Sequence, residues 1–365
     1  MPSRLQQTKS IMRKILLFLV TLTAMPLLAQ NEVSTFLSGT NEGITYCLPD
    51  TRIDITVNAA CITRTPGEFN IYAERFLRIN NAITEAASHW EITGAVVTTS
   101  GKPNNEKMYT IKLNSGVAFN VNLCKNGVIS GINTNAKEQE TEVRGKTLTK
   151  SGNSHIDATQ YMTSEMLQAT SKAKLAELTA KEIYAIRESK LAITRGLSEN
   201  MPKDGQSMQL VLDELNKQEK ALTELFTGRI DTIYSSHSYT IEPEIGCDIT
   251  KAVLFRFSRK LGFLDKEDLA GEPVYYNLRD MKTVHIPTLE ELEKKKLVKK
   301  EGICYNIPGK ADFSLFTRSK KLYSSEIHIA QFGTTEVLAK ELFNKKANAK
   351  VLFNTATGGI TSIEK

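Results

Sequence analysis

The stretch from Ala158 to Gly228 constrains the fold most, because it predicts two helices joined by a tight loop. Apolar residues return at helical spacing from Met166 to Leu197, and a second apolar stripe runs from Met208 to Phe226. The loop between the two stripes reads MPKDG. A connection this short favours antiparallel packing of the two helices.

The two predicted helices differ in length. The first spans about 48 Å and the second about 30 Å, at about 1.5 Å per residue. Pro202 and Gly205 are expected to end the first helix, with Ser207 as the N-cap of the second and Gly228 as its end. The first helix should therefore overhang by about 18 Å. The overhang would pack on a β-rich domain, project into solvent or contact a partner.

Patterns typical of strands occupy both sides of this stretch. From residue 31 to 132, apolar residues alternate over strand lengths with Gly, Asn and Pro between them, and Asn126–Gly127 is a good hairpin turn. The segment Pro66–Ser88 interrupts this pattern and predicts one short helix, with a second possible turn around Ala82–Ala87. After Gly228 the strand pattern returns, most clearly in KAVLFRFS.

The sequence therefore predicts an α+β fold in which two β-rich, sandwich-like or barrel-like domains are joined by a long antiparallel helical hairpin. The expected divisions are a signal peptide (residues 1–29), an N-terminal β-rich domain with a short helical insert (30–135), a polar linker (136–157), the helical hairpin (158–228) and a C-terminal β-rich domain (229–365).

The two β-rich parts contain a weak internal echo. GITYCLP at residues 43–49 matches GICYNIP at residues 302–308. Further along, VAFN at residues 117–120 and VLFN at residues 351–354 are each followed by a glycine turn and an isoleucine-containing strand. The order is the same in both halves, which indicates a pseudo-repeat.

The N-terminus predicts export. Arg13 and Lys14 precede ILLFLVTLTAMPLLA, which has the length of a signal-peptide core, and cleavage after Ala29 would leave Gln30 first. The run has about 15 residues against about 20 for a membrane span, which disfavours an uncleaved anchor. Without the four basic residues of the leader, the net charge falls from +6 to +2. This balance disfavours a nucleic-acid partner. The expected location is periplasmic, outer-membrane-associated or secreted, without a transmembrane span in the mature chain, and peripheral membrane association is compatible with it.

The five cysteines show no CxxC spacing, so a zinc or redox site is not expected. Most lie in apolar strand-like runs, where cysteine packs as a small hydrophobe. Export permits disulfides, and the pair Cys47–Cys61 is the favoured bridge because its members are expected on consecutive strands. The full set is Cys47, Cys61, Cys124, Cys247 and Cys304.

A search for catalytic chemistry finds no HExxH, P-loop or GxSxG motif. His237 lies in a run of hydroxyl side chains, yet a strand histidine facing water is the simpler interpretation. Glu68 with Glu74 is a carboxylate pair that could serve acid–base chemistry. Glu242 with Glu244 could hold calcium, although a solvated turn explains both. No catalytic, cofactor-binding or metal-ligating residue is assigned, and no cofactor is expected.

The central stretch carries a family resemblance. The runs Ile183–Lys190 (IYAIRESK), Pro202–Gly205 (PKDG) and Leu215–Gly228 resemble an uncharacterised family of exported proteins from Bacteroides-type bacteria, domain of unknown function 4831. GITYCLP and the segment Pro66–Leu77 are similar to it as well, so the resemblance covers nearly all of the mature chain. It implies an envelope protein with no known activity, and it supplies no catalytic residues.

The functional expectation is a non-enzymatic, exported cell-envelope protein with a structural or interaction role and an envelope protein as partner. A glycan- or peptide-processing hydrolase is the first alternative, because its carboxylates would converge only in the fold. A glycan or small-ligand binding module that uses Trp90, Tyr72 and Phe76 is the second; otherwise Trp90 anchors the core. The candidate interaction surface consists of Tyr184, Arg187, Lys190 and Lys217.

Overall fold

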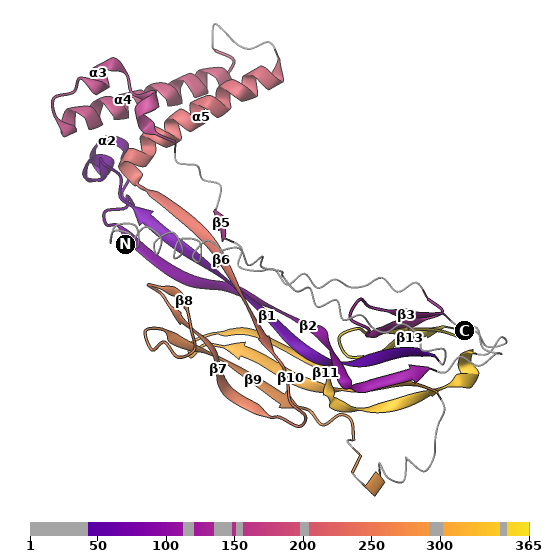
Figure 1. The fold of residues 1–365 in the computed structure, drawn as a ribbon. Helices are drawn as coiled ribbons and strands as arrows, with labels where there is room; N and C mark the ends of the chain where they lie inside the picture. The colour runs from indigo at the N-terminus through magenta and orange to yellow at the C-terminus, as the bar shows by residue number, and fades with distance from the viewer. Residues whose placement is uncertain are drawn as a thin grey trace, which may run out of the picture.

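The computed structural model shows a β-rich molecule with a group of helices at one end (Figure 1). The predicted signal peptide and most of the predicted polar linker lie outside the described residues. The described residues are 43–111, 120–134, 148–150, 156–197, 204–285, 287–288, 290–291, 302–343 and 349–364.

The first sheet is built on one very long antiparallel hairpin. Its strands follow the order β2-β1-β6-β5, and every pairing is antiparallel. The sequence predicts several short strands here, but the chain passes through bulges rather than turns and keeps its direction. The strands are β1 (Ile44–Thr65), β2 (Ala87–Ile111), β5 (Leu148–Lys150) and β6 (Arg229–Ile241).

A second, five-stranded sheet has the order β11-β10-β9-β7-β8. It contains a second long hairpin, formed by β10 and β11. Its strands are β7 (Ile249–Ser258), β8 (Gly262–Leu264), β9 (Glu272–Asp280), β10 (Gly302–Phe316) and β11 (Lys321–Ala339).

These two sheets share one core. Ile53 and Ile55 of β1 are fully buried in the same cluster as Phe313 of β10 and Phe332 of β11. Fully burying side chains of this size contributes about 1.5–3 kcal/mol each. Strands from both ends of the chain therefore build a common sandwich, where the sequence predicts two β-rich domains that meet only through the helices.

A small third sheet also combines strands from the N-terminal and C-terminal parts of the chain. Its order is β13-β12-β4-β3, and it covers a cluster that includes Tyr46 of β1 and Ile303 of β10. The predicted Asn126–Gly127 turn is confirmed between β3 and β4, with Gly127 at φ 79°, in the region that favours glycine. The strands are β3 (Val121–Leu123), β4 (Ile129–Ile132), β12 (Lys350–Phe353) and β13 (Ile360–Glu364), with the 3-10 helix η3 (Lys340–Phe343) before β12.

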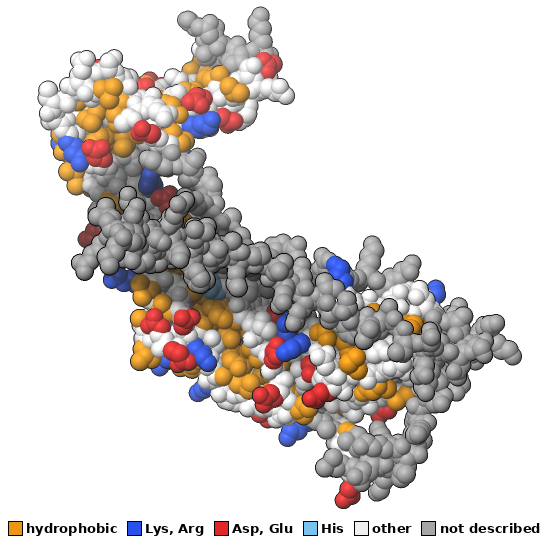
Figure 2. Space-filling model, viewed as in Figure 1, with side chains coloured by type: hydrophobic (Ala, Val, Ile, Leu, Met, Phe, Trp, Pro, Cys, Tyr) orange, Lys and Arg blue, Asp and Glu red, His pale blue; other side chains and the backbone are white. Residues whose placement is uncertain are grey.

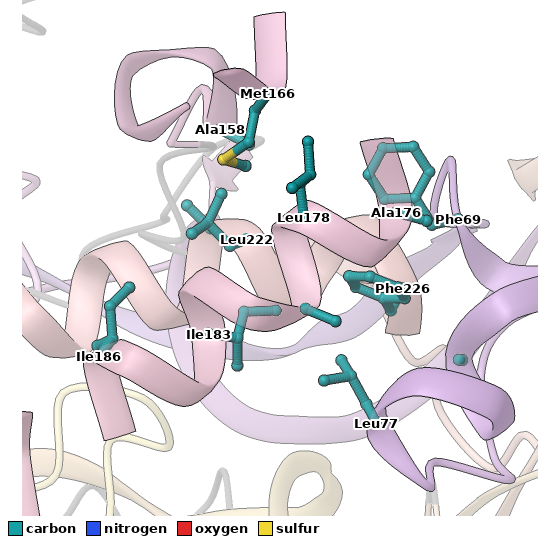
Figure 3. Packing of buried hydrophobic residues seen from close by; sticks show 13 residues of the cluster. Phe69, Leu77, Ala158, Met166, Ala176, Leu178, Ile183, Ile186, Leu222 and Phe226 are labelled. Atoms are coloured by element: carbon teal, nitrogen blue, oxygen red, sulfur yellow. The ribbon is translucent and has the colours of Figure 1, made fainter. Parts of the chain in front are cut away.

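The helices form a separate unit at one end of β1, β2 and β6, called here the helical head (Figure 1). Its core consists of residues from the helices and the turn at Phe69, among them Met166, Leu222 and Phe226 (Figure 3). Phe69 packs edge-on against Phe226, with ring centres 5.4 Å apart. The elements are η1 (Asn70–Tyr72), α2 (Ala73–Leu77), η2 (Ala158–Tyr161), α3 (Ser164–Leu167), α4 (Lys172–Thr194) and α5 (Gly205–Thr227).

The predicted first helix is broken in the structure. Ser171 adopts an extended backbone and its Oγ accepts a hydrogen bond from the Lys174 amide at 3.2 Å, which starts α4 anew after α3. Both α4 and α5 consequently have 23 residues. The predicted overhang of about 18 Å, reckoned from the rise per residue, is therefore wrong. The apolar period continues across the break because α3 and α4 pack on the same core.

Helix ends follow local capping chemistry. Asp204, not Ser207, is the N-cap of α5, because its carboxylate accepts a hydrogen bond from the Ser207 amide at 2.8 Å. Gly228 ends α5 at φ 77°, as predicted. The short helix within Pro66–Ser88 is confirmed as η1 and α2, whereas no helical turn forms around Ala82–Ala87, where the chain straightens into β2.

The echo between GITYCLP and GICYNIP marks equivalent positions in the two long hairpins. At each motif proline the first strand advances by two residues while the second advances by five. The register jumps run from Cys47–Met108 to Pro49–Pro103 in the first hairpin and from Ile307–Thr334 to Gly309–Ile329 in the second.

The hydrogen bonds around the glycine turns repeat as well. The Cys47 amide donates to the Gly127 carbonyl at 3.0 Å, and the Asn306 amide donates to the Gly358 carbonyl at 3.0 Å. Within the turns, Cys124 N bonds to Val128 O and Asn354 N bonds to Gly359 O, both at 2.8 Å. These bonds align Val121 with Val351. The predicted pairing of VAFN with VLFN is thus shifted, and residues 117–119 lie outside the described part of the chain.

Candidate interaction surface

The two long helices of the head are held together by a small polar cluster as well as by their apolar faces. Arg187 on α4 lies 2.6 Å from a carboxylate oxygen of Glu219 on α5, and Lys190 contacts the other oxygen. Lys190 also donates to the Asn216 side chain at 2.9 Å. Residue numbers rise along α4 as they fall along α5, so the two helices run in opposite directions.

Glu219 is the centre of this cluster. Burial by itself would raise the pKa of Glu219, but the hydrogen bonds from Lys190 and Arg187 outweigh it and hold the pKa below its ordinary value. The carboxylate is therefore ionised at neutral pH and paired with two cations. Charge-assisted bonds of this kind fix the angle at which two helices meet more sharply than apolar contact does.

The residues predicted as an interaction surface lie on or beside this cluster. The Tyr184 hydroxyl donates to the Phe76 carbonyl at 3.0 Å, which ties α4 to α2. The Arg187 guanidinium carbon lies 5.6 Å from the centre of the Tyr184 ring. Lys217 is set apart on the exposed side of α5, 3.6 Å from Glu214. The structure therefore brings together Tyr184, Arg187 and Lys190, and leaves Lys217 separate.

The most exposed apolar side chains of the long helices are at the end of the head that lies away from the sandwich. Leu197 is 72% exposed after α4, and Leu210 is 73% exposed in the first turns of α5. Leu191 on α4 is 47% exposed. Hydrophobic side chains are visible on the surface of the head in Figure 2. The sequence pattern did not single out this group, because it places Leu197 in the packing stripe of the first helix and leaves Leu191 and Leu210 outside both stripes.

A polar hollow of about 410 Å3 lies where the β2 bulge meets the β6–β7 loop. Two of its carboxylates, Glu242 and Asp50, are paired with lysines. Lys102 lies 2.8 Å from Glu242, and Asp50 accepts hydrogen bonds from Asn104 at 2.8 Å and from Lys107 at 3.2 Å. The predicted pair Glu242 and Glu244 lines this hollow, but Glu242 is engaged by a lysine.

The other sequence candidates serve the fold. The His237 ring stacks on Phe263 with centres 4.2 Å apart, so it packs between aromatic rings rather than facing a hydroxyl-rich site. Glu68 lies 3.9 Å from Lys172 at the surface. Trp90 packs over Gly262, where an added Cβ would lie 3.1 Å from the indole. Tyr72 and Phe76 contact the helical core instead, so the three predicted ligand-stacking rings do not gather.

The cysteines are all free thiols in the structure. The predicted Cys47–Cys61 bridge is wrong, because both residues lie on the single strand β1. Fourteen positions of extended chain place them about 46 Å apart. Burial raises the pKa of the Cys47, Cys247 and Cys304 thiols, which fits residues that pack as small hydrophobes.

Two further searches bear on function. In the described ranges, no group of three or more His, Cys, Asp or Glu residues could hold a metal ion. None of the helices seen in those ranges combines the length and the apolar composition of a membrane span.

Comparison with known proteins gives one match. No curated protein and no solved structure matches the chain. A family model described as a domain of unknown function, DUF4831, matches residues 42–361. The matched segment includes every strand of the sandwich and every helix of the head, and the chain therefore belongs to the DUF4831 family.

Proposed function

We propose that this protein is exported to the cell envelope and acts there as a non-enzymatic structural or interaction protein, with the helical head as the part that contacts a partner. One observation carries the proposal: the head has a core of its own and is held beyond the sandwich on β1, β2 and β6. Its far end exposes Leu197 and Leu210.

Two features of the head support a docking role. The helices α4 and α5 form an antiparallel hairpin that the Arg187–Glu219 pair holds at a fixed angle, so a partner would meet a preformed surface. Exposed leucines next to polar residues are typical of contact surfaces, because burial of apolar area drives association. We infer that the helices which present this surface are held in position by Tyr184, Arg187 and Lys190. Lys217 lies at the rim of the surface.

Export is supported by the leader sequence. Arg13 and Lys14 stand before an apolar run of signal-peptide length, and the family match starts at residue 42, beyond the expected cleavage after Ala29. N-terminal sequencing of protein recovered from the native bacterium tests this part. A mature chain that starts at Gln30 supports it, and an intact leader on cytoplasmic protein would contradict it.

The partner surface is tested by photo-cross-linking in intact cells. A photoreactive amino acid at Leu210 should give one discrete cross-linked species, because the side chain is 73% exposed at the end of the head. Leu269 is the matched control, since it is 81% exposed on the sandwich. Equal cross-linking from both positions, or none from Leu210, would contradict a docking role for the head.

A further inference from the structure

A groove of about 490 Å3 opens between the first residues of β2 and the second sheet. It is called here the Trp90 groove, and nothing in the function proposed above uses it. Its floor is apolar and includes Trp90, Ile92, Phe257, Val274 and Leu322, whereas charged side chains of both signs surround it.

The edge of β2 in this groove presents free backbone groups. The Trp90 amide donates to the Arg259 carbonyl at 2.7 Å and so points away from β1. In an antiparallel ladder both backbone groups of a residue point to the same side, and every second residue repeats that direction. The register from Trp90–Cys61 to Ile92–Ala59 is continuous. The N–H and C=O of Ile92 must therefore point away from β1 as well.

The Ile92 groups have no hydrogen-bond partner among the described residues. The one-residue bulge at Thr93 comes only after Ile92, so it does not reverse this direction. An edge strand with a free donor and acceptor is a template for another extended chain. Ile92 thus offers both backbone bonds that one residue of a peptide needs.

The charged rim of the groove is also unpartnered. Two acidic and two basic side chains line the opening: Glu91, Glu272, Arg259 and Lys320. Within the described part of the chain, none of these four side chains forms an ion pair or a side-chain hydrogen bond. In the polar hollow at Asp50, by contrast, lysines already pair with Asp50 and Glu242.

We propose that the Trp90 groove binds a short extended peptide, which adds as a strand to the edge of β2 at Ile92 and lays one apolar side chain on the groove floor. Basic and acidic residues of the peptide face the charged rim. A peptide fits better than a sugar, because Ile92 offers the donor and acceptor of a strand ladder. The four charged side chains suit a ligand of mixed charge.

The protein carries its own reporter for this test, since Trp90 is the only tryptophan. The full-length protein is titrated with the peptide acetyl-Lys-Thr-Ile-Thr-Glu-amide, and Trp90 emission is followed. A saturable change is expected, and the same peptide with Asn in place of the central Ile should bind about tenfold more weakly because the floor is apolar. Cellobiose is titrated in parallel as the carbohydrate probe.

The matched variants are Ile92→Pro and Ile92→Val. Proline removes the outward N–H while sparing the pairing with β1, and it is tolerated on an edge strand where that N–H is free. Ile92→Pro should weaken peptide binding about tenfold, since one hydrogen bond and its geometry are lost, whereas Ile92→Val should bind nearly as well as the parent. Circular dichroism checks that each variant is folded.

If Ile92→Pro fails to fold, the peptide itself supplies the variant. N-methylation of the central Ile removes the donor that would pair with the Ile92 carbonyl, and binding should again fall about tenfold. Equal binding of the methylated peptide would overturn the proposal. So would a saturable response to cellobiose with none to the peptide, or the absence of any response to the peptide at millimolar concentration.

Discussion

The two long hairpins, β1–β2 and β10–β11, are alike at one end and different at the other. Both carry a motif proline at the same bulge, and both send a backbone amide two residues before that proline to a glycine carbonyl. At the opposite end, β10 and β11 are joined by residues 317–320, with Thr317 N bonded to Lys320 O at 2.8 Å. The first hairpin instead opens into η1 and α2, which belong to the helical head.

This difference distinguishes the sandwich itself from the helical head that is attached to it. The sandwich is complete at the β10–β11 end with a tight turn, so the larger connection between β1 and β2 is not required to form it. Residues 66–86 supply Phe69 and Leu77 to the head core, and α3, α4 and α5 close over them. The head is thus an elaboration at one end of one repeat, which is where a gain of function is expected.

The largest expected effect comes from Gly333→Ala at the bulge of the second hairpin. An added Cβ would lie 1.8 Å from the Ile307 carbonyl oxygen and 2.9 Å from the Gly309 amide. The backbone of both strands would have to separate, which should cost at least about 4 kcal/mol of unfolding free energy. Urea unfolding followed by Trp90 emission measures it. Gly94→Ala is the control, because its Cβ meets nothing within 4 Å; equal losses in both variants would refute the bulge geometry.

Phe226→Ala and Phe313→Ala should distinguish the head from the sandwich. Both side chains are fully buried, one in each core, and removal of either should cost about 3–5 kcal/mol. Phe226→Ala should lower the midpoint of the unfolding transition seen by circular dichroism of the helices, and leave the midpoint seen by Trp90 emission unchanged. Phe313→Ala should lower the midpoint seen by Trp90 emission and leave that of the helices unchanged. A single transition that shifts alike in both variants would show that head and sandwich unfold as one unit.

Asn306→Cys tests whether the two repeats are interchangeable, because Cys47 holds the equivalent position. The side-chain amide nitrogen of Asn306 donates to the carbonyls of Pro49 at 3.1 Å and Thr357 at 2.9 Å. A thiol cannot replace both bonds, so a loss of about 2 kcal/mol is expected in urea unfolding. Cys47→Ser should cost less than half as much. Equal costs would mean that the Asn306 bonds do not join the repeats.

The smallest effect is expected from Glu219→Gln. The folded-state pKa of Glu219 is lowered, so its contribution to stability is present above the ordinary glutamate pKa and is lost as pH falls through the folded value. At pH 7 the variant should destabilise the head by about 1 kcal/mol, since the carboxylate pairs with Arg187 and Lys190. The helix transition of parent and variant should converge at low pH. A stability difference between parent and variant that grows as pH falls would contradict this expectation.

Local chemistry made much of the fold predictable. The Asn126–Gly127 turn, the end of α5 at Gly228 and the strand around Phe255 all depend on nearby residues. The shared sandwich could not be read in the same way, because the cluster of Ile53 with Phe313 joins positions far apart in the chain. The predicted Cys47–Cys61 bridge failed for a related reason: a bulge at Pro49 resembles a turn in sequence, yet β1 passes through it.

The candidate surface was only partly readable. The runs around Tyr184 and Lys190 pointed to the helices, but their partners Phe76 and Glu219 lie on other elements. Leu210 belongs to neither predicted apolar stripe, so the apolar pattern did not point to it. Its side chain is 73% exposed because of its position on α5. The free Ile92 backbone depends on strand order, and a single sequence does not give strand order.

Hydrogen exchange of the protein in intact envelopes, compared with the purified protein, tests most directly whether the added head is the part that binds. The protein in envelopes should gain protection in Leu191–Leu197 and in the first turns of α5, with β10 and β11 unchanged. New protection confined to the sandwich, or exchange identical in both samples throughout the head, would contradict it.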